Sequence, residues 1–118
     1  MELDAWIEFD SDEMEKWKGG EWAKDVVGGE LAKSRSPFFP NGHDAFDAVK
    51  SLANSEKYET DWIDNLTRYV IVPKSELLKL IKKLHCNIDH INQRLDELMA
   101  FVETLPADKN YKLVCQEF

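Results

Sequence analysis

The chain has 118 residues, 43% of them hydrophobic, and its 23 acidic and 15 basic side chains give a net charge of −8. This length is typical of one domain, so we expect residues 1–118 to form a single folding unit with a small core. The negative charge argues against binding to nucleic-acid backbone, which favours basic surfaces, and favours a basic protein partner instead.

Residues 2–9 alternate between apolar and polar side chains, which predicts a half-buried strand. Trp6 falls on the polar side, among carboxylates. Two interpretations stay open: another part of the fold covers Trp6, or Trp6 is an aromatic anchor in an acidic binding face. The first fifteen residues hold seven acids and no base. We therefore expect the partner-binding surface here, formed by Glu2, Asp4, Trp6, Glu8, Asp10, Asp12 and Glu13.

Short helices and a loop are expected next. The six-residue pattern of 19–24 recurs at 28–33 with five identical positions, and its glycine pairs indicate helix ends. Residues 34–42 form a proline-rich loop, in which Phe38 and Phe39 are expected to close the core. A helix is predicted over 43–54 and a single helical turn over 60–65.

Two more strands complete the expected sheet. Residues 66–72 are rich in β-branched and aromatic side chains, and residues 111–117 alternate loosely. The series lacks the repeated strand–helix order of a parallel sheet. We therefore predict an α+β fold, with a small antiparallel sheet packed against short helices and one long amphipathic helix over about 75–105.

An unbroken heptad pattern covers the predicted long helix. Its apolar positions, from Leu77 to Leu105, alternate in steps of four and three. A helix of this length spans roughly 45 Å, whereas strands of five to seven residues span only about 17–24 Å. We therefore expect the overhang to meet a second copy of the chain. The predicted homodimer interface consists of Ile81, Leu84, Ile88, Ile91, Leu95 and Leu98.

Two alternatives to this dimer stay open. The helix can simply cover its own sheet, or it can break near residues 85–87, with Asn87 capping a second helix that folds back. The positions beside the heptad pattern are apolar at both ends and polar in the middle, which is unusual for a simple two-stranded coiled coil.

No motif in the sequence predicts an enzymatic site. Cys86, Asp89 and His90 share one helix face, as metal ligands on helices do, but they match no metal-binding signature, and a solvated polar face is the better interpretation. No nucleophile motif or nucleotide-binding glycine motif is present. We therefore expect no catalytic residues, no metal site and no cofactor.

The cellular location follows from what the sequence lacks. The N-terminal residues do not have the pattern of a secretory signal, and no apolar run approaches the ~20 residues of a membrane span. Cys86 and Cys115 form no CxxC motif, so free thiols are expected. These features predict a cytoplasmic protein without a membrane partner.

In size, charge and compartment the chain resembles small acidic bacterial immunity proteins and toxin inhibitors, which neutralise basic nucleases inside the cell. The resemblance implies a non-enzymatic inhibitor that binds a basic partner. The alternative is a small-molecule-binding protein or small enzyme, with a pocket between the sheet, the long helix and the 34–42 loop, lined by Trp17, Trp22 or Trp62. A third hypothesis is a subunit with a purely structural role.

Overall fold

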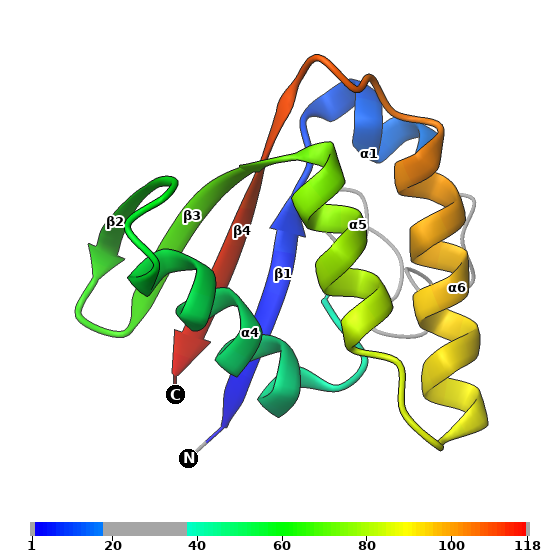
Figure 1. Ribbon diagram of the computed structural model, residues 1–118, viewed down its shortest axis with the longest axis horizontal. Coiled ribbons are helices and arrows are strands. Elements are labelled where there is room, and N and C mark those ends of the chain that lie inside the picture. Colours follow the sequence, from blue (N-terminus) through cyan, green and yellow to red (C-terminus); the bar gives the residue numbers. More distant parts are fainter. Residues whose placement is uncertain (1, 18–37, 118) are drawn as a thin grey trace.

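The computed structural model of the protein describes residues 2–17 and 38–117. It confirms an α+β fold with an antiparallel sheet, whose four strands lie in the order β1-β4-β3-β2 (Figure 1). The strands are β1 (Leu3–Glu8), β2 (Glu59–Asp64), β3 (Thr67–Pro73) and β4 (Asn110–Glu117). The helices in the described residues are α1 (Ser11–Trp17), α4 (Gly42–Asn54), α5 (Lys74–Lys83) and α6 (Asp89–Glu103).

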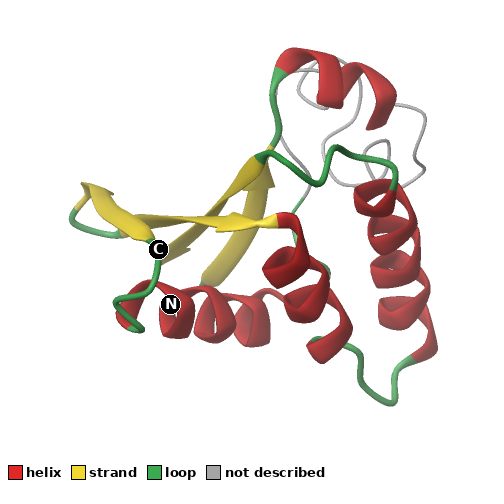
Figure 2. Ribbon diagram, turned by 45° about the horizontal axis from the view of Figure 1, so that its top comes forward, coloured by secondary structure: helices red, strands yellow, loops and turns green. Residues whose placement is uncertain are grey.

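Helix α4 lies across β1, β4 and β3, while α5 leaves the end of β3 and α6 packs beside α5 (Figure 2). Alternate strand residues face these helices, so register partners such as Ile7 and Leu113 are both fully buried. Gly42 allows the close approach of α4 to β1, because a Cβ at this position would lie 2.6 Å from the carbonyl oxygen of Leu3.

The prediction of a helical turn at 60–65 is wrong, because residues 59–64 form strand β2. Its partner is β3, and a tight turn at Asn65 and Leu66 joins the two strands. The strand has no apolar alternation because almost all of its side chains are exposed, so the sequence carried no strand periodicity there. The sheet therefore has one strand more than the expected set near 2–9, 66–72 and 111–117.

The prediction of a single long helix over 75–105 is also wrong. Helix α5 ends at Lys83, α6 begins at Asp89, and the two helices run side by side as a hairpin. The whole molecule measures 36 × 35 × 31 Å, so a straight helix of roughly 45 Å would extend beyond it. The structure therefore shows the alternative that the sequence left open, a helix break near residues 85–87.

Polar side chains stabilise this break. The imidazole of His85 lies 3.0 Å from the carbonyl oxygen of Ile81 and 2.7 Å from Asp96 of α6. The side-chain amide of Asn92 both accepts from the N–H of Cys86 and donates to its carbonyl. The expected cap at Asn87 is not formed, because Ile88 occupies the N-cap position without a side-chain hydrogen bond. The polar middle of the heptad pattern is therefore the turn between two helices.

The predicted dimer interface is mostly core of the same chain. Because the segment folds into a helical hairpin, the apolar side chains of both helices face the core, and few of them remain accessible to a partner. Ile91 is partly buried and Ile88 is 43% exposed. The residues of the predicted interface that the fold buries are Ile81, Leu84, Leu95 and Leu98.

Candidate functional site

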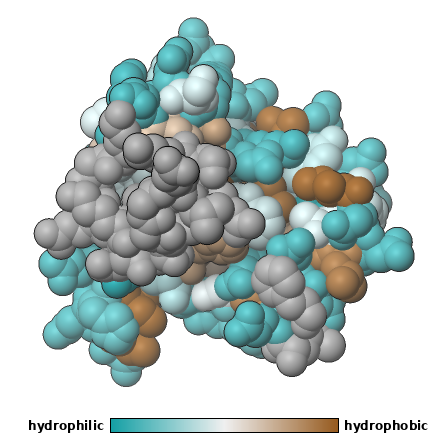
Figure 3. All heavy atoms as spheres, turned by 180° about the vertical axis from the view of Figure 1, so that it is seen from behind, coloured by the Kyte–Doolittle hydropathy of each residue, from teal (hydrophilic) through white to brown (hydrophobic). Residues whose placement is uncertain are grey.

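The largest exposed apolar side chains gather on the β2–β3 hairpin. Among the described residues, Trp62, Ile63 and Leu66 are 57%, 53% and 52% exposed, and Ile88 is the remaining strongly exposed large hydrophobic residue. From behind, separate hydrophobic patches stand among hydrophilic atoms (Figure 3). Clustered apolar exposure of this kind marks interaction sites more often than scattered exposure does.

Three carboxylates lie on the same hairpin as these apolar side chains. Glu59, Asp61 and Asp64 are exposed, and none of them forms an ion pair with a residue that the structure describes. The backbone N–H of Leu66 and the side chain of Thr67 lower the pKa of Asp64. We name the following group the acidic hairpin surface: Glu59, Asp61, Trp62, Ile63, Asp64 and Leu66.

Trp62 is held in place from one side. The guanidinium of Arg68 lies 5.3 Å from the centre of the indole ring. The same guanidinium donates to the side chain of Asn54 and to the carbonyl of Ala53 at the C-terminal end of α4. It also donates to the hydroxyl of Thr60, 3.2 Å away. Because three other groups hold the cation, it gives the exposed indole a fixed surface to pack against before any partner arrives.

Local hydrogen bonds and a β-bulge define the shape of the hairpin. The side chain of Asp64 accepts the N–H of Leu66 at 2.8 Å, which forms a tight turn. The register shifts between Trp62 and Asp64, so Ile63 lies at a β-bulge. The N–H of Glu117 bonds to the carbonyl of Leu66 and ties the turn to β4. The hairpin is thus an ordered part of the sheet that lies at the opposite end of the molecule from α6 (Figure 1).

The expected N-terminal binding face is largely occupied by internal contacts. The ammonium of Lys109 binds both Asp10 and Glu13, and it lowers the pKa of Asp10. Lys112 lies 3.3 Å from Glu8. Trp6 packs against Phe38 with ring centres 5.0 Å apart, which supports the interpretation that another part of the fold covers it.

The remaining members of that face are less constrained. Glu2 and Asp12 are exposed, and Asp4 is partly buried, which raises the pKa of its carboxyl group, with a further contribution from the charge of Glu2. Partner binding by this face stays a prediction. Three further exposed carboxylates lie on the acidic hairpin surface, which the sequence did not indicate as a binding site. One signal was present: the Trp-Ile-acid sequence of 6–8 recurs at 62–64.

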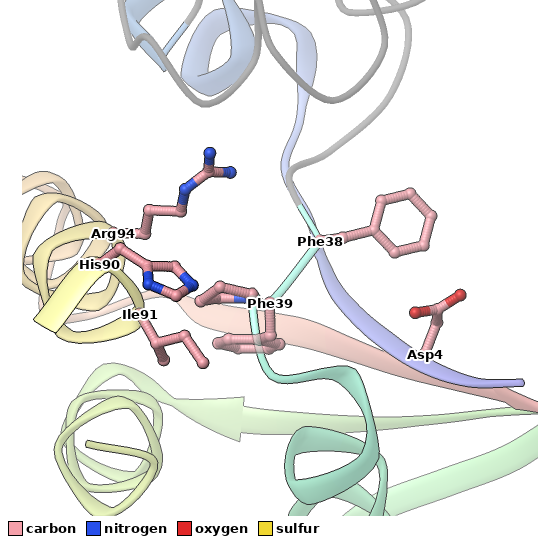
Figure 4. Close-up of a pocket in the computed structure, with 7 residues that line it drawn as sticks. Asp4, Phe38, Phe39, His90, Ile91 and Arg94 are labelled. Atoms are coloured by element: carbon pink, nitrogen blue, oxygen red, sulfur yellow. The ribbon is translucent and has the colours of Figure 1, made fainter. Parts of the chain in front are cut away.

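A cavity lies where the alternative hypothesis expects a pocket. Residues 38–40 bound it on one side and α6 supplies His90, Ile91 and Arg94 on the other (Figure 4). Its volume is about 460 Å³, and Asp4 of β1 also lines it. Of the three tryptophans expected around the pocket, Trp17 and Trp62 do not line this cavity, and Trp22 lies outside the described residues. Residues 34–37 and both copies of the 19–24 pattern also lie outside them.

A groove follows the outer side of the α5–α6 hairpin. It measures about 650 Å³, and Leu78 and Met99 are its apolar members. The two walls carry opposite charges, because Lys79 and Lys82 come from α5 and the carboxylates come from α6. Those carboxylates are Asp96 and Glu103.

The described residues contain no group of three histidine, cysteine or carboxylate side chains able to hold a metal ion. The three residues that were considered as metal ligands, Cys86, Asp89 and His90, are all exposed. Both cysteines are free thiols, and burial raises the pKa of Cys115. No helix within 2–17 and 38–117 is long and apolar enough to cross a membrane.

No protein family, curated protein or solved structure matches this chain.

Proposed function

We propose that this chain is a protein-binding domain that recognises a basic partner through the acidic hairpin surface. One observation carries the proposal: three large apolar side chains, each more than half exposed, lie on the same hairpin as three exposed carboxylates that have no ion-pair partner among the described residues. Apolar anchors supply affinity when a partner removes them from water, and the carboxylates select a partner of opposite charge.

The preorganised indole strengthens this proposal. Tryptophan is favoured at the centre of protein interfaces because it buries a large area while losing few rotatable bonds. Arg68 already covers one side of the Trp62 ring, so binding does not need to order it. The net charge of −8 adds long-range attraction for a basic partner, which speeds encounter. An inhibitor of a basic toxin or nuclease is the specific form that the resemblance to immunity proteins suggests.

Two charge-reversal variants test the proposal. Glu59→Lys with Asp61→Lys changes the hairpin, and Asp44→Lys with Asp108→Lys is the control at two exposed carboxylates outside both proposed binding surfaces. Each replacement adds two positive charges, so both variants carry −4 instead of −8. The probe is an array of fluorescent peptides, each with equal numbers of lysine and valine in different orders, measured by anisotropy.

The hairpin variant should weaken the best peptide about tenfold or more, and the control less than about threefold. Equal weakening by both variants would mean that net charge alone causes binding. A wild-type protein that binds no peptide in the array would overturn the proposal. Circular dichroism confirms that each variant is folded.

The cavity beside α6 supports a second candidate function, the binding of a small aromatic molecule. Phe39 and Pro40 offer apolar surface, His90 lines the cavity from α6, and Asp4 of β1 adds a carboxylate. A thermal-shift screen with neutral and cationic aromatic compounds tests this candidate, using His90→Ala as the matched variant. No shift across the panel would remove it.

The homodimer stays a prediction, and its interface moves to the outer face of α5 and α6. A two-fold axis parallel to these helices would set α5 of one copy over α6 of the other. The lysines of one wall would then face the carboxylates of the other wall. Sedimentation of the wild-type chain and of Leu78→Asp tests the prediction, and a monomer at all concentrations would refute it.

A further inference from the structure

The two edges of the sheet differ in how their backbone groups are paired. At the β1 edge, Phe38 forms a bridge with Trp6, and the N–H of Phe39 donates to the carbonyl of Ala5 at 2.9 Å. At the β2 edge, no described residue pairs with the outer side of the strand. Every second residue of an edge strand directs its N–H and C=O outward, so these groups of β2 have no backbone partner among the described residues. One donor of the strand, the N–H of Trp62, bonds to the side chain of Asp61 at 2.8 Å, a local bond that an added strand would replace.

The side chains of β2 alternate in chemistry as well as in direction. Thr60 and Trp62 share the face of Arg68, which is the face covered by α4. Glu59 and Asp61 lie on the opposite face, because successive residues of a strand alternate. A strand added beside β2 would therefore meet carboxylates on one face and a hydroxyl and an indole on the other.

We propose that the basic partner binds as an extended segment that adds a fifth strand to the open edge of β2, with lysine or arginine alternating with apolar residues. The basic residues lie opposite Glu59 and Asp61, and the apolar residues lie beside Thr60 and Trp62. Cross-strand pairs of opposite charge stabilise a sheet, and aromatic residues pair well with β-branched ones. This inference rests on the proposed function and specifies how the partner is bound.

The same carboxylates exclude a second copy of this chain at the edge. An antiparallel pair of two β2 strands keeps each residue on its own face, so Glu59 and Asp61 would lie opposite the same carboxylates of the other copy. Like charges directly opposite one another destabilise the pair. Charged edges of this kind also prevent aggregation through strand pairing.

The length of the added strand follows from the register. Regular pairing of β2 with β3 covers Glu59 to Trp62, and the bulge at Ile63 interrupts it. The segment therefore needs about five residues in extended form. Beyond the bulge, Ile63 and Leu66 remain exposed and can contact the end of the segment.

N-methylated peptides test the strand pairing directly. The probe is a peptide of about eight residues with alternating lysine and valine, compared with an isomer in which the lysines form one block. Two further versions carry backbone N-methyl groups, either on all valines or on all lysines. Because only every second residue of an added strand bonds to β2, one methylated version should lose binding and the other should keep it.

We expect the alternating peptide to bind about tenfold tighter than its block isomer, and one methylated version to bind at least about tenfold more weakly than the other. Equal binding by both methylated versions would overturn strand addition. In that case the hairpin variant with Glu59→Lys and Asp61→Lys still decides the proposed function separately. If that variant also leaves binding unchanged, both proposals fail.

Discussion

Trp6-Ile7-Glu8 and Trp62-Ile63-Asp64 place nearly the same three side chains on the two edge strands of one sheet. In β1 the isoleucine is fully buried, while in β2 it is 53% exposed. The tryptophan of β1 packs against Phe38, and that of β2 is open on the side away from Arg68. Equal local sequence therefore leads to a closed edge in one case and an open edge in the other.

The difference comes from what lies around each strand. Helix α4 covers one face of β1, and Phe38 and Phe39 cover its outer edge. Strand β2 pairs only with β3 among the described elements, and its bulge displaces Ile63 from the regular register. A short apolar sequence is thus core or contact surface according to its neighbours, because burial requires a second surface.

The largest expected difference between the two edges concerns the matched isoleucines. Ile7→Asp places an unpaired carboxylate in a fully buried site and should cost at least about 4 kcal/mol in the free energy of unfolding, which is enough to unfold many small domains. Ile63→Asp should change it by less than about 0.5 kcal/mol. Urea denaturation followed by circular dichroism measures both. Comparable losses at the two sites would show that the β2 edge is covered.

The matched tryptophans should separate stability from binding. Trp6→Ala removes the contact with Phe38 and should cost about 2 kcal/mol in unfolding free energy. Trp62→Ala should cost less than about 1 kcal/mol but weaken the alternating peptide about tenfold. Denaturation and anisotropy on the same samples provide the measurements. Unchanged peptide affinity in Trp62→Ala would remove the indole from the proposed site.

Acid titration compares the carboxylates near the two edges. The pKa of Asp10 is lowered mainly by Lys109, and that of Asp64 by the backbone N–H of Leu66, both from 3.8. A lowered folded-state pKa stabilises the protein above the unfolded value, and this contribution is lost as the pH falls through the lowered pKa. Lys109→Met should raise the pKa of Asp10 toward its unfolded value and so reduce the loss of stability below pH ~4. The contribution of Asp64 to this loss should remain. The same decrease in unfolding free energy below pH ~4 in the variant and the wild type would contradict this prediction.

The smallest expected effect lies away from both edges, at the turn between α5 and α6. The hydrogen bond to Asp96 raises the pKa of His85 above 6.5. Stability from this pair is complete below the unfolded value and is lost as the pH rises through the raised pKa. Asp96→Asn should flatten this dependence, as measured by urea denaturation from pH 6 to pH 9. Ile63→Asp should not alter it, which makes the pair a control for the β2 edge.

The heptad pattern shows how far periodicity alone can lead. It correctly marked positions such as Leu84 and Leu95 as apolar contacts, since both are buried. It could not say which surface they contact, because a helix that meets another chain and a helix that folds back on its own core require the same spacing. The polar residues His85 and Asn92 mark the turn between the two helices, but their hydrogen bonds became visible only in three dimensions.

The candidate site was missed for a related reason. Strand β2 is exposed on both faces, so it lacks the alternation that predicts a strand, and its carboxylates are no denser than those at the N-terminus. The N-terminal carboxylates of Asp10 and Glu13 looked free in the sequence, yet Lys109, about a hundred residues away, binds both.

The α+β class, the antiparallel sheet and the acidic charge could be predicted, because composition and local periodicity control these properties. The division of the long amphipathic segment into two helices, the covering of Trp6 and the exposure of Trp62 became clear only in the folded chain. These outcomes depend on contacts between residues distant in the chain, such as His85 with Asp96 and Trp6 with Phe38. A local pattern predicts that an apolar side chain will be buried. The fold determines whether it is buried in the core of the same chain or against a partner.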